Sequence, residues 1–249
     1  MIQRLKAQGF GILVALLSRE ALDRLSRALG KGSRLGEIDL VFEVAEAEIE
    51  RGTMVDVGAR FGTSLQAFAR AGWDVLAVEP DPRNQIALNV VCNLRPNVRL
   101  DTRACWDERG TLTLWEDPVR TSITTLIPFD SQHRGSGSVE VLPLRELLVE
   151  REVERLSVLK VDTEGADLRV LVGAGWDGAH RPAIVMCEFD ERKVDHGGHE
   201  WNLAASFLHE RGYRVLVSDV VSRTALRGFT QMAPIGGLPL HTLRPFGKR

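Results

Sequence analysis

The segment from Asp56 to Ser64 contains a glycine turn whose residue types suit a nucleoside cofactor. Gly58 and Gly62 lack a Cβ atom, so the backbone at these positions can turn tightly and approach a ligand closely. Glu79 ends the next apolar segment, where an acidic side chain can accept hydrogen bonds from both ribose hydroxyls of an adenosine. The residues predicted to contact the cofactor here are Asp56, Gly58, Ala59, Arg60, Phe61, Gly62, Thr63, Ser64, Glu79, Pro80 and Asp81.

The spacing of the glycines discriminates between NAD and S-adenosylmethionine, which both present a ribose. A dinucleotide site uses the pattern G-x-G-x-x-G, in which three glycines admit a pyrophosphate to the start of a helix. Here the pattern is Gly58-x-x-x-Gly62, and an arginine and a phenylalanine fill the space of the middle glycine. A turn that is acidic at Asp56 and crowded at Phe61 fits a cationic ligand without phosphate, so we expect S-adenosylmethionine. The alternative is a structural turn that binds no ligand.

The elements that must position this turn alternate between two periodicities. Apolar segments that predict strands occur at residues 54–57, 75–78, 98–104, 111–115, 139–142, 158–161, 183–187, 213–218 and 238–243. Helical periodicity occurs at residues 38–50, 63–71, 83–93, 144–154, 166–172 and 201–211. This alternation predicts an α/β fold with a mostly parallel sheet and helices on both faces.

The N-terminal segment predicts a separate helix. Apolar residues recur at helical spacing between Ile12 and Leu29, and Gly30 ends the pattern. We therefore expect a helical extension at residues 1–34 and the main domain at residues 35–249. The extension is expected to pack on the main domain or on a partner such as a second subunit of a homodimer. A membrane-surface helix is the alternative, which the mixed charge of its polar face disfavours.

Composition and charge exclude several classes of partner. The chain has 249 residues and a net charge of −2, with basic residues balanced by acidic ones, which argues against nucleic acid. Its three cysteines lack CxxC spacing, so we expect a reduced, cytoplasmic protein without a disulfide framework. The longest strongly apolar run, residues 10–17, is too short to span a bilayer, so no transmembrane segment is expected.

Three segments together resemble the FkbM family of methyltransferases. They are the glycine turn at residues 55–59, the Val-Glu-Pro-Asp-Pro segment at residues 78–82 and the Leu-Lys-Val-Asp-Thr-Glu-Gly-Ala-Asp segment at residues 159–167. The resemblance extends over roughly residues 38–245. It implies a Rossmann-like class I methyltransferase fold with a seven-stranded sheet. It also implies S-adenosylmethionine-dependent O-methylation of a sugar, glycan or polyketide-type hydroxyl. A nitrogen acceptor and a noncatalytic cofactor-binding protein remain alternatives.

The resemblance places Asp162 and Glu164 near the reacting methyl group and the acceptor, and we predict that both are catalytic. Both follow an apolar segment, at the sheet edge where ligands bind. Either carboxylate can orient the hydroxyl, or accept its proton if burial raises its pKa. We also expect Asp162 to contact the cofactor. For Glu164 the alternative is a cap on the helix that begins at Ala166.

His196 and His199 are further candidates for the catalytic base. They lie in a glycine-containing loop after the predicted strand at residues 183–187, and an imidazole with a pKa near 6.5 suits proton transfer at neutral pH. The alternative is a surface loop without a catalytic role. A metal held by these histidines with Asp162 and Glu188 is disfavoured because H-x-x-H differs from the helical i, i+4 spacing of zinc enzymes. We therefore expect no metal.

The adenine is expected to lie beside the residues that follow the third strand. Ala104 and Cys105 begin this segment, and the side chain of Asp107 is placed to reach the amino group of the adenine. Trp106 either stacks on the ligand or covers the core.

Overall fold

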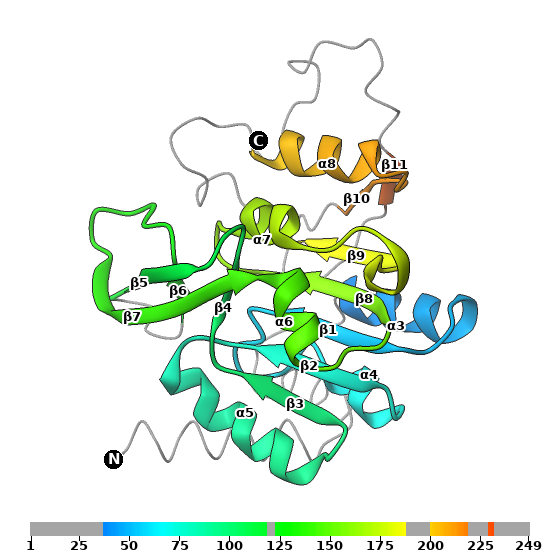
Figure 1. The fold of residues 1–249 in the computed structure, drawn as a ribbon, viewed down its shortest axis with the longest axis horizontal. Coiled ribbons are helices and arrows are strands. Elements are labelled where there is room, and N and C mark those ends of the chain that lie inside the picture. The colour runs from blue at the N-terminus through cyan, green and yellow to red at the C-terminus, as the bar shows by residue number, and fades with distance from the viewer. Residues whose placement is uncertain (1–36, 119–122, 188–199, 219–228, 232–249) are drawn as a thin grey trace, which may run out of the picture.

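The described part of the chain, in a computed structural model, folds around a central sheet of five parallel strands (Figure 1). The structure describes residues 37–118, 123–187, 200–218 and 229–231. The strand order is β3-β2-β1-β8-β9, so β1 lies at the centre between β2 and β8. These strands are β1 (Thr53–Val57), β2 (Asp74–Val78), β3 (Val98–Asp101), β8 (Leu156–Val161) and β9 (Ile184–Cys187).

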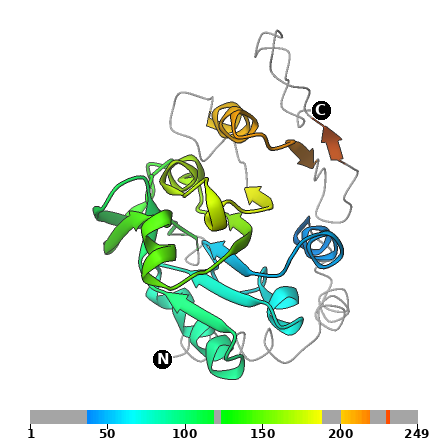
Figure 2. The same ribbon diagram turned by 45° about the vertical axis from the view of Figure 1, so that its right-hand side comes forward.

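Successive residues of the central strands alternate between two apolar cores, as the two-residue period of a strand requires. Met54 and Val75 belong to one core, to which three helices contribute: α3 (Glu37–Glu48), α4 (Gln66–Arg70) and α5 (Pro82–Leu94). Val55 and Leu76 belong to the other, to which α6 (Leu144–Glu150), α7 (Asp167–Gly173) and α8 (Glu200–Glu210) contribute. Figure 2 shows α3 and α7 on opposite sides of the sheet.

A second sheet of four strands lies beyond the carboxyl ends of the parallel strands (Figure 1). Its order is β4-β7-β5-β6. The single strand expected at residues 98–104 is therefore wrong. β3 ends at Asp101, whose buried carboxylate accepts a hydrogen bond from the backbone N–H of Arg103 at 2.9 Å and turns the chain. The strands of the second sheet are β4 (Ala104–Trp106), β5 (Gly110–Glu116), β6 (Thr124–Thr125) and β7 (Arg134–Pro143).

Two predicted helices are shorter than expected because their ends form turns. The helix expected at residues 63–71 begins only at Gln66, after the backbone has passed Gly62 with a positive φ of 72°. The helix expected at residues 144–154 ends at Glu150, and Glu152 adopts a positive φ of 52° that a helix does not continue through.

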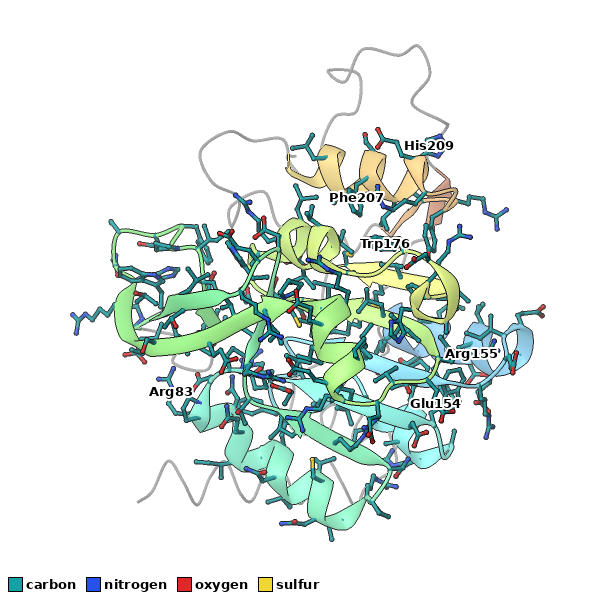
Figure 3. All side chains as sticks on the ribbon, in the orientation of Figure 1. Arg83, Glu154, Arg155, Trp176, Phe207 and His209 are labelled. Carbon is teal, nitrogen blue, oxygen red and sulfur yellow. The ribbon has the colours of Figure 1, made fainter. Side chains whose placement is uncertain are left out.

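Aromatic side chains hold α8 against the body of the protein. The rings of Trp176 and Phe207 point toward each other with 5.5 Å between their centroids (Figure 3). The guanidinium of Arg211 lies 3.4 Å from the centroid of Phe207 and stacks over that ring. A short 3-10 helix (Gly178–His180) leads from this cluster into β9.

The remaining strands form a separate pair. β10 (Leu216–Ser218) and β11 (Phe229–Gln231) pair antiparallel with each other, so the seven-stranded central sheet stays a prediction. The helical extension expected at residues 1–34 and the strand expected at residues 238–243 lie outside the described residues. Within the described residues, no helix combines the length and apolar character needed to cross a bilayer.

The close contact between α7 and β4 gives a stability prediction. A Cβ atom at Gly173 would lie 2.0 Å from the carbonyl oxygen of Trp106, and both groups belong to the backbone of packed elements. We expect Gly173→Ala to lower the free energy of unfolding by about 1–3 kcal/mol, measured by urea denaturation with circular dichroism.

Gly110→Ala is the matched control, because its Cβ atom would lie 3.9 Å from the nearest heavy atom, in Val141. Its free energy of unfolding should stay within about 0.5 kcal/mol of the wild type. Equal losses in the two variants would show that the α7–β4 contact does not constrain the fold.

Candidate active site

A cleft opens where β1, β2 and β8 end and the second sheet begins. Its empty volume is about 650 Å³, which includes the open solvent at its mouth. The residues that line it are Val57, Gly58, Arg60, Val78, Glu79, Pro80, Asn84, Ala104, Cys105, Leu114, Ile123, Thr124, Thr125, Leu126, Asp162, Thr163 and Glu164. The carboxyl ends of the strands and the second sheet thus line one cleft.

The glycine turn is locked to the loop that follows β8. The backbone N–H of Gly58 donates to the carbonyl of Val78 at 2.9 Å, and that of Asp162 donates to the carbonyl of Val57 at 3.0 Å. Gly58 has a φ of 80°, and a Cβ atom there would lie 1.9 Å from the carbonyl oxygen of Asp162. Glycine is therefore required at this position by the neighbouring loop as well as by any ligand.

Glu79 lies buried in the floor of the cleft with three hydrogen-bond donors around its carboxylate. Its Oε2 accepts from the backbone N–H of Arg60 at 2.7 Å. Its Oε1 accepts from the backbone N–H of Asp81 at 2.9 Å and from the side chain of Asn84 at 3.3 Å. A carboxylate offers about four acceptor positions, so that of Glu79 retains capacity for about one further donor. A second further donor would have to displace the 3.3 Å hydrogen bond from Asn84.

Burial has the largest effect on the pKa of Glu79. Removal of the carboxylate from water outweighs the hydrogen bonds from Asp81, Arg60 and Asn84, and it raises the pKa of Glu79 to about 7. This acid therefore changes its charge near neutral pH.

Asp162 and Glu164 enter the cleft from the loop after β8. Glu164 has a positive φ of 58°, an unusual conformation for a residue with a side chain. The hydroxyl of Thr125 in β6 donates to the backbone carbonyl of Glu164 at 2.9 Å, and it accepts from the backbone N–H of Ile127 at 3.0 Å. The second sheet thus fixes the backbone on which both predicted catalytic carboxylates lie.

A buried ion pair lies behind Asp162. The Nζ atom of Lys160 lies 3.0 Å from Oδ1 of Asp56 and 3.4 Å from Oδ2 of Asp162. Oδ2 of Asp56 accepts a hydrogen bond from the hydroxyl of Ser64. Burial disfavours the charged ammonium, but the two carboxylates outweigh it and raise the pKa of Lys160 above its ordinary value.

The structure brings only part of the predicted site to the cleft. The predicted residues that line it are Gly58, Arg60, Glu79, Pro80, Ala104, Cys105, Asp162 and Glu164. Those that do not line it are Asp56, Ala59, Phe61, Gly62, Thr63, Ser64, Asp81 and Asp107.

The residues outside the cleft lining have other contacts. Asp56 and Ser64 belong to the ion-pair network described above, and Asp81 caps α5 by accepting from the backbone N–H of Arg83 at 2.9 Å. Asp107 pairs with Arg169 at 2.6 Å. Their contacts with a cofactor stay predictions.

The histidines predicted as bases, His196 and His199, lie outside the described residues, as does Glu188. In the part of the chain that the structure describes, no group of three or more His, Cys, Asp or Glu side chains is arranged to hold a metal ion.

Sequence reasoning missed several polar residues of this region, among them Asn84 and Lys160. Asn84 lines the cleft and donates to Glu79, and its position in the first turns of an ordinary amphipathic helix gave no signal. Lys160 was quoted only as part of a motif. A signal for it existed, because Lys160 and Asp56 have opposite charges and each is the one charged residue of its mainly apolar strand.

The charge of the cleft favours a cation. Three carboxylates, those of Glu79, Asp162 and Glu164, line it, whereas Arg60 supplies the one basic side chain among the described lining residues. The guanidinium of Arg60 lies 5.1 Å from the ring centroid of Phe61.

The parallel sheet, glycine turn and acidic cleft are consistent with a Rossmann-like methyltransferase. Comparison with protein families gives a match to the methyltransferase FkbM domain over residues 56–215, well over half of the chain. The protein therefore belongs to the FkbM methyltransferase family. A search of curated proteins gives no match.

The buried Glu79 gives a prediction for the pH dependence of stability. Its pKa is raised to about 7 from an ordinary value of 4.5, so its contribution to stability is present below about pH 4.5 and is lost as the pH rises through 7. Glu79→Gln stays neutral at every pH. Between pH 5 and 8 we expect the wild type to lose up to about 3 kcal/mol of stability relative to this variant.

Urea denaturation at a series of pH values measures this difference. The control is Glu154→Gln, because Glu154 is an exposed carboxylate far from the cleft (Figure 3). If the free energies of unfolding of the wild type and of Glu79→Gln change in parallel with pH, the raised pKa of Glu79 is contradicted.

Proposed function

We propose that this protein is an S-adenosylmethionine-dependent O-methyltransferase that acts on a hydroxyl of a sugar, a glycan or a polyketide-type natural product. One observation carries the proposal: the buried carboxylate of Glu79 and the carboxylate of Asp162 lie in one cleft, on either side of the Gly58 turn. Membership of a methyltransferase family supports it.

The residues of the cleft fit this cofactor in three respects. Glu79 retains an acceptor position for a ribose hydroxyl, and Asn84 beside it offers a second polar group. The missing Cβ of Gly58 lets the loop that carries Asp162 lie directly against the turn, so that both line the same cleft. The excess of carboxylates suits a sulfonium cation, which supplies the methyl group when the cofactor is bound.

The strand order orients these groups along the cleft. Glu79 follows β2, Gly58 follows β1 and Asp162 follows β8, and these strands are neighbours in that order. A ribose held at Glu79 therefore leaves the β1–β8 side, with Asp162, for the reacting end of the ligand. Holding the reacting groups in line accounts for much of the catalysis of such transfers, roughly 7–11 kcal/mol.

A hydroxyl acceptor also has to lose a proton. Asp162 and Glu164 are the described acids at the reacting end, and His196 and His199 stay candidate bases. Thr124 also lines the cleft, and its hydroxyl-bearing side chain is suited to an acceptor that carries several hydroxyl groups.

Cofactor identity is tested by titration calorimetry with S-adenosylhomocysteine, with NAD as a second ligand. We expect S-adenosylhomocysteine to bind with a Kd on the order of micromolar, and NAD to give no signal. Glu79→Ala should weaken binding about tenfold to a hundredfold, because it removes a charge-assisted hydrogen bond of about 1.5–3 kcal/mol. Glu154→Ala, an exposed control, should bind as the wild type does. Binding of NAD, or of neither ligand, would overturn the proposal.

The acceptor is tested with S-adenosylmethionine that carries a trideuterated methyl group and a panel of sugars, phenolic polyketides and amines. We expect the label in a methyl ether, identified by mass spectrometry and NMR, and no labelled product with Asp162→Asn. Label on nitrogen would contradict the hydroxyl acceptor while leaving the cofactor assignment in place.

A further inference from the structure

Lys160 is a buried lysine in the central sheet, directly behind the reacting end of the cleft. Its side chain is 8% exposed, and its two carboxylate neighbours are Asp56, which is fully buried, and Asp162, which is 33% exposed. A buried ammonium is costly unless it is paired, so its presence within a fully buried, mainly apolar strand needs an explanation.

The register of the sheet connects the lysine to the cleft. Lys160 and Asp56 are paired residues of β8 and β1, so the two charges meet side by side. Asp162 follows Lys160 by two residues at the end of β8, and its carboxylate lines the cleft. Asp56 alone supplies enough negative charge to neutralise Lys160. The contact with Asp162 places the positive charge of Lys160 next to a residue that lines the cleft.

The acids around Asp162 make its charge unfavourable without a nearby cation. Asp167 in α7 is buried, and burial together with the charge of Asp162 raises the pKa of Asp167 to about 6. Glu164 and Glu79 line the same cleft, and Cys187 in β9 also lies within electrostatic range of Lys160. The ammonium of Lys160, whose Nζ atom lies 3.4 Å from Oδ2 of Asp162, opposes this repulsion.

We propose that Lys160 is a positioning residue that keeps the Asp162 carboxylate ionised and directed toward the reacting end of the cleft. This inference rests on the proposed cofactor. Asp162 then interacts with the sulfonium charge and orients the acceptor as a hydrogen-bond acceptor. It does not take up the acceptor proton at neutral pH, because the ammonium stabilises its ionised form.

The test compares S-adenosylmethionine, which carries the sulfonium charge, with S-adenosylhomocysteine, which lacks it. Both ligands carry the same ribose, and Glu79 and Asp167 titrate in the wild type and in every variant, so their effect cancels when the pH dependence of the ratio in a variant is compared with that in the wild type. In the wild type we expect the ratio of the two dissociation constants to favour S-adenosylmethionine. In Asp162→Asn the preference should be about tenfold smaller at every pH, because the charge is gone.

The decisive variant is the double substitution Lys160→Met with Asp56→Asn. Lys160→Met alone would leave Asp56 buried without its cation, whereas the double variant removes both members of the pair. Relative to the wild type, we expect its preference for S-adenosylmethionine to fall about threefold to tenfold as the pH drops from 8 to 6, because Asp162 then gains a proton. Asp56→Asn alone is the control. It can change both affinities, but the pH dependence of their ratio should match that of the wild type.

A ratio in the double variant that equals the wild-type ratio at every pH would overturn the proposal and leave Lys160 a purely structural role. If the double variant does not fold, a carbon-13 carboxyl titration of the wild type decides, with Asp162→Asn used for assignment. Asp162 is expected to stay ionised from pH 5 to 8, and a titration step in that range would overturn the proposal. Failure of the proposed function is distinct, because neither ligand would then bind the wild type.

Discussion

The contact between the Gly58 turn and the Asp162 loop is the constraint on which the site depends. The carbonyl oxygen of Asp162 occupies the position that a Cβ atom of residue 58 would take, and the backbone N–H of Asp162 bonds to Val57. Two loops that are distant in the sequence are thereby fixed within van der Waals contact. The backbone N–H of Arg60, in the same turn, donates a hydrogen bond to Glu79. The three loops that follow β1, β2 and β8 are therefore fixed relative to one another.

Burial and charge divide the acids of the cleft into different roles. Glu79 lies in the floor, where desolvation raises its pKa to about 7. Asp162 lies beside Lys160, with 3.4 Å between its Oδ2 and the Nζ atom of the lysine. Asp167 lies behind the loop, where its Oδ2 accepts from the hydroxyl of Thr163 at 2.9 Å. We propose that these three carboxylic acids serve as a ribose acceptor, a fixed negative charge and a loop support, according to their surroundings.

The sequence predicted the parts of the fold that repeat a local pattern. Every residue of β1 is buried, so its apolar run located the strand within one residue. The break after Asp101 was missed because alternation continues through it, and the cause is a side-chain bond to the Arg103 backbone. The pair of Asp56 and Lys160 was missed because it joins strands 104 positions apart, which only the register of the sheet reveals. Glu79 and Asp162 were found because each directly follows an apolar strand.

A crystal structure of the complex with S-adenosylhomocysteine tests the central claim most directly. We predict a ribose hydroxyl within hydrogen-bond distance of Glu79, the adenine beside Ala104 and Cys105, and the sulfur atom on the β1–β8 side of the cleft near Asp162. A ligand bound elsewhere, or one whose ribose makes no contact with Glu79, would contradict it.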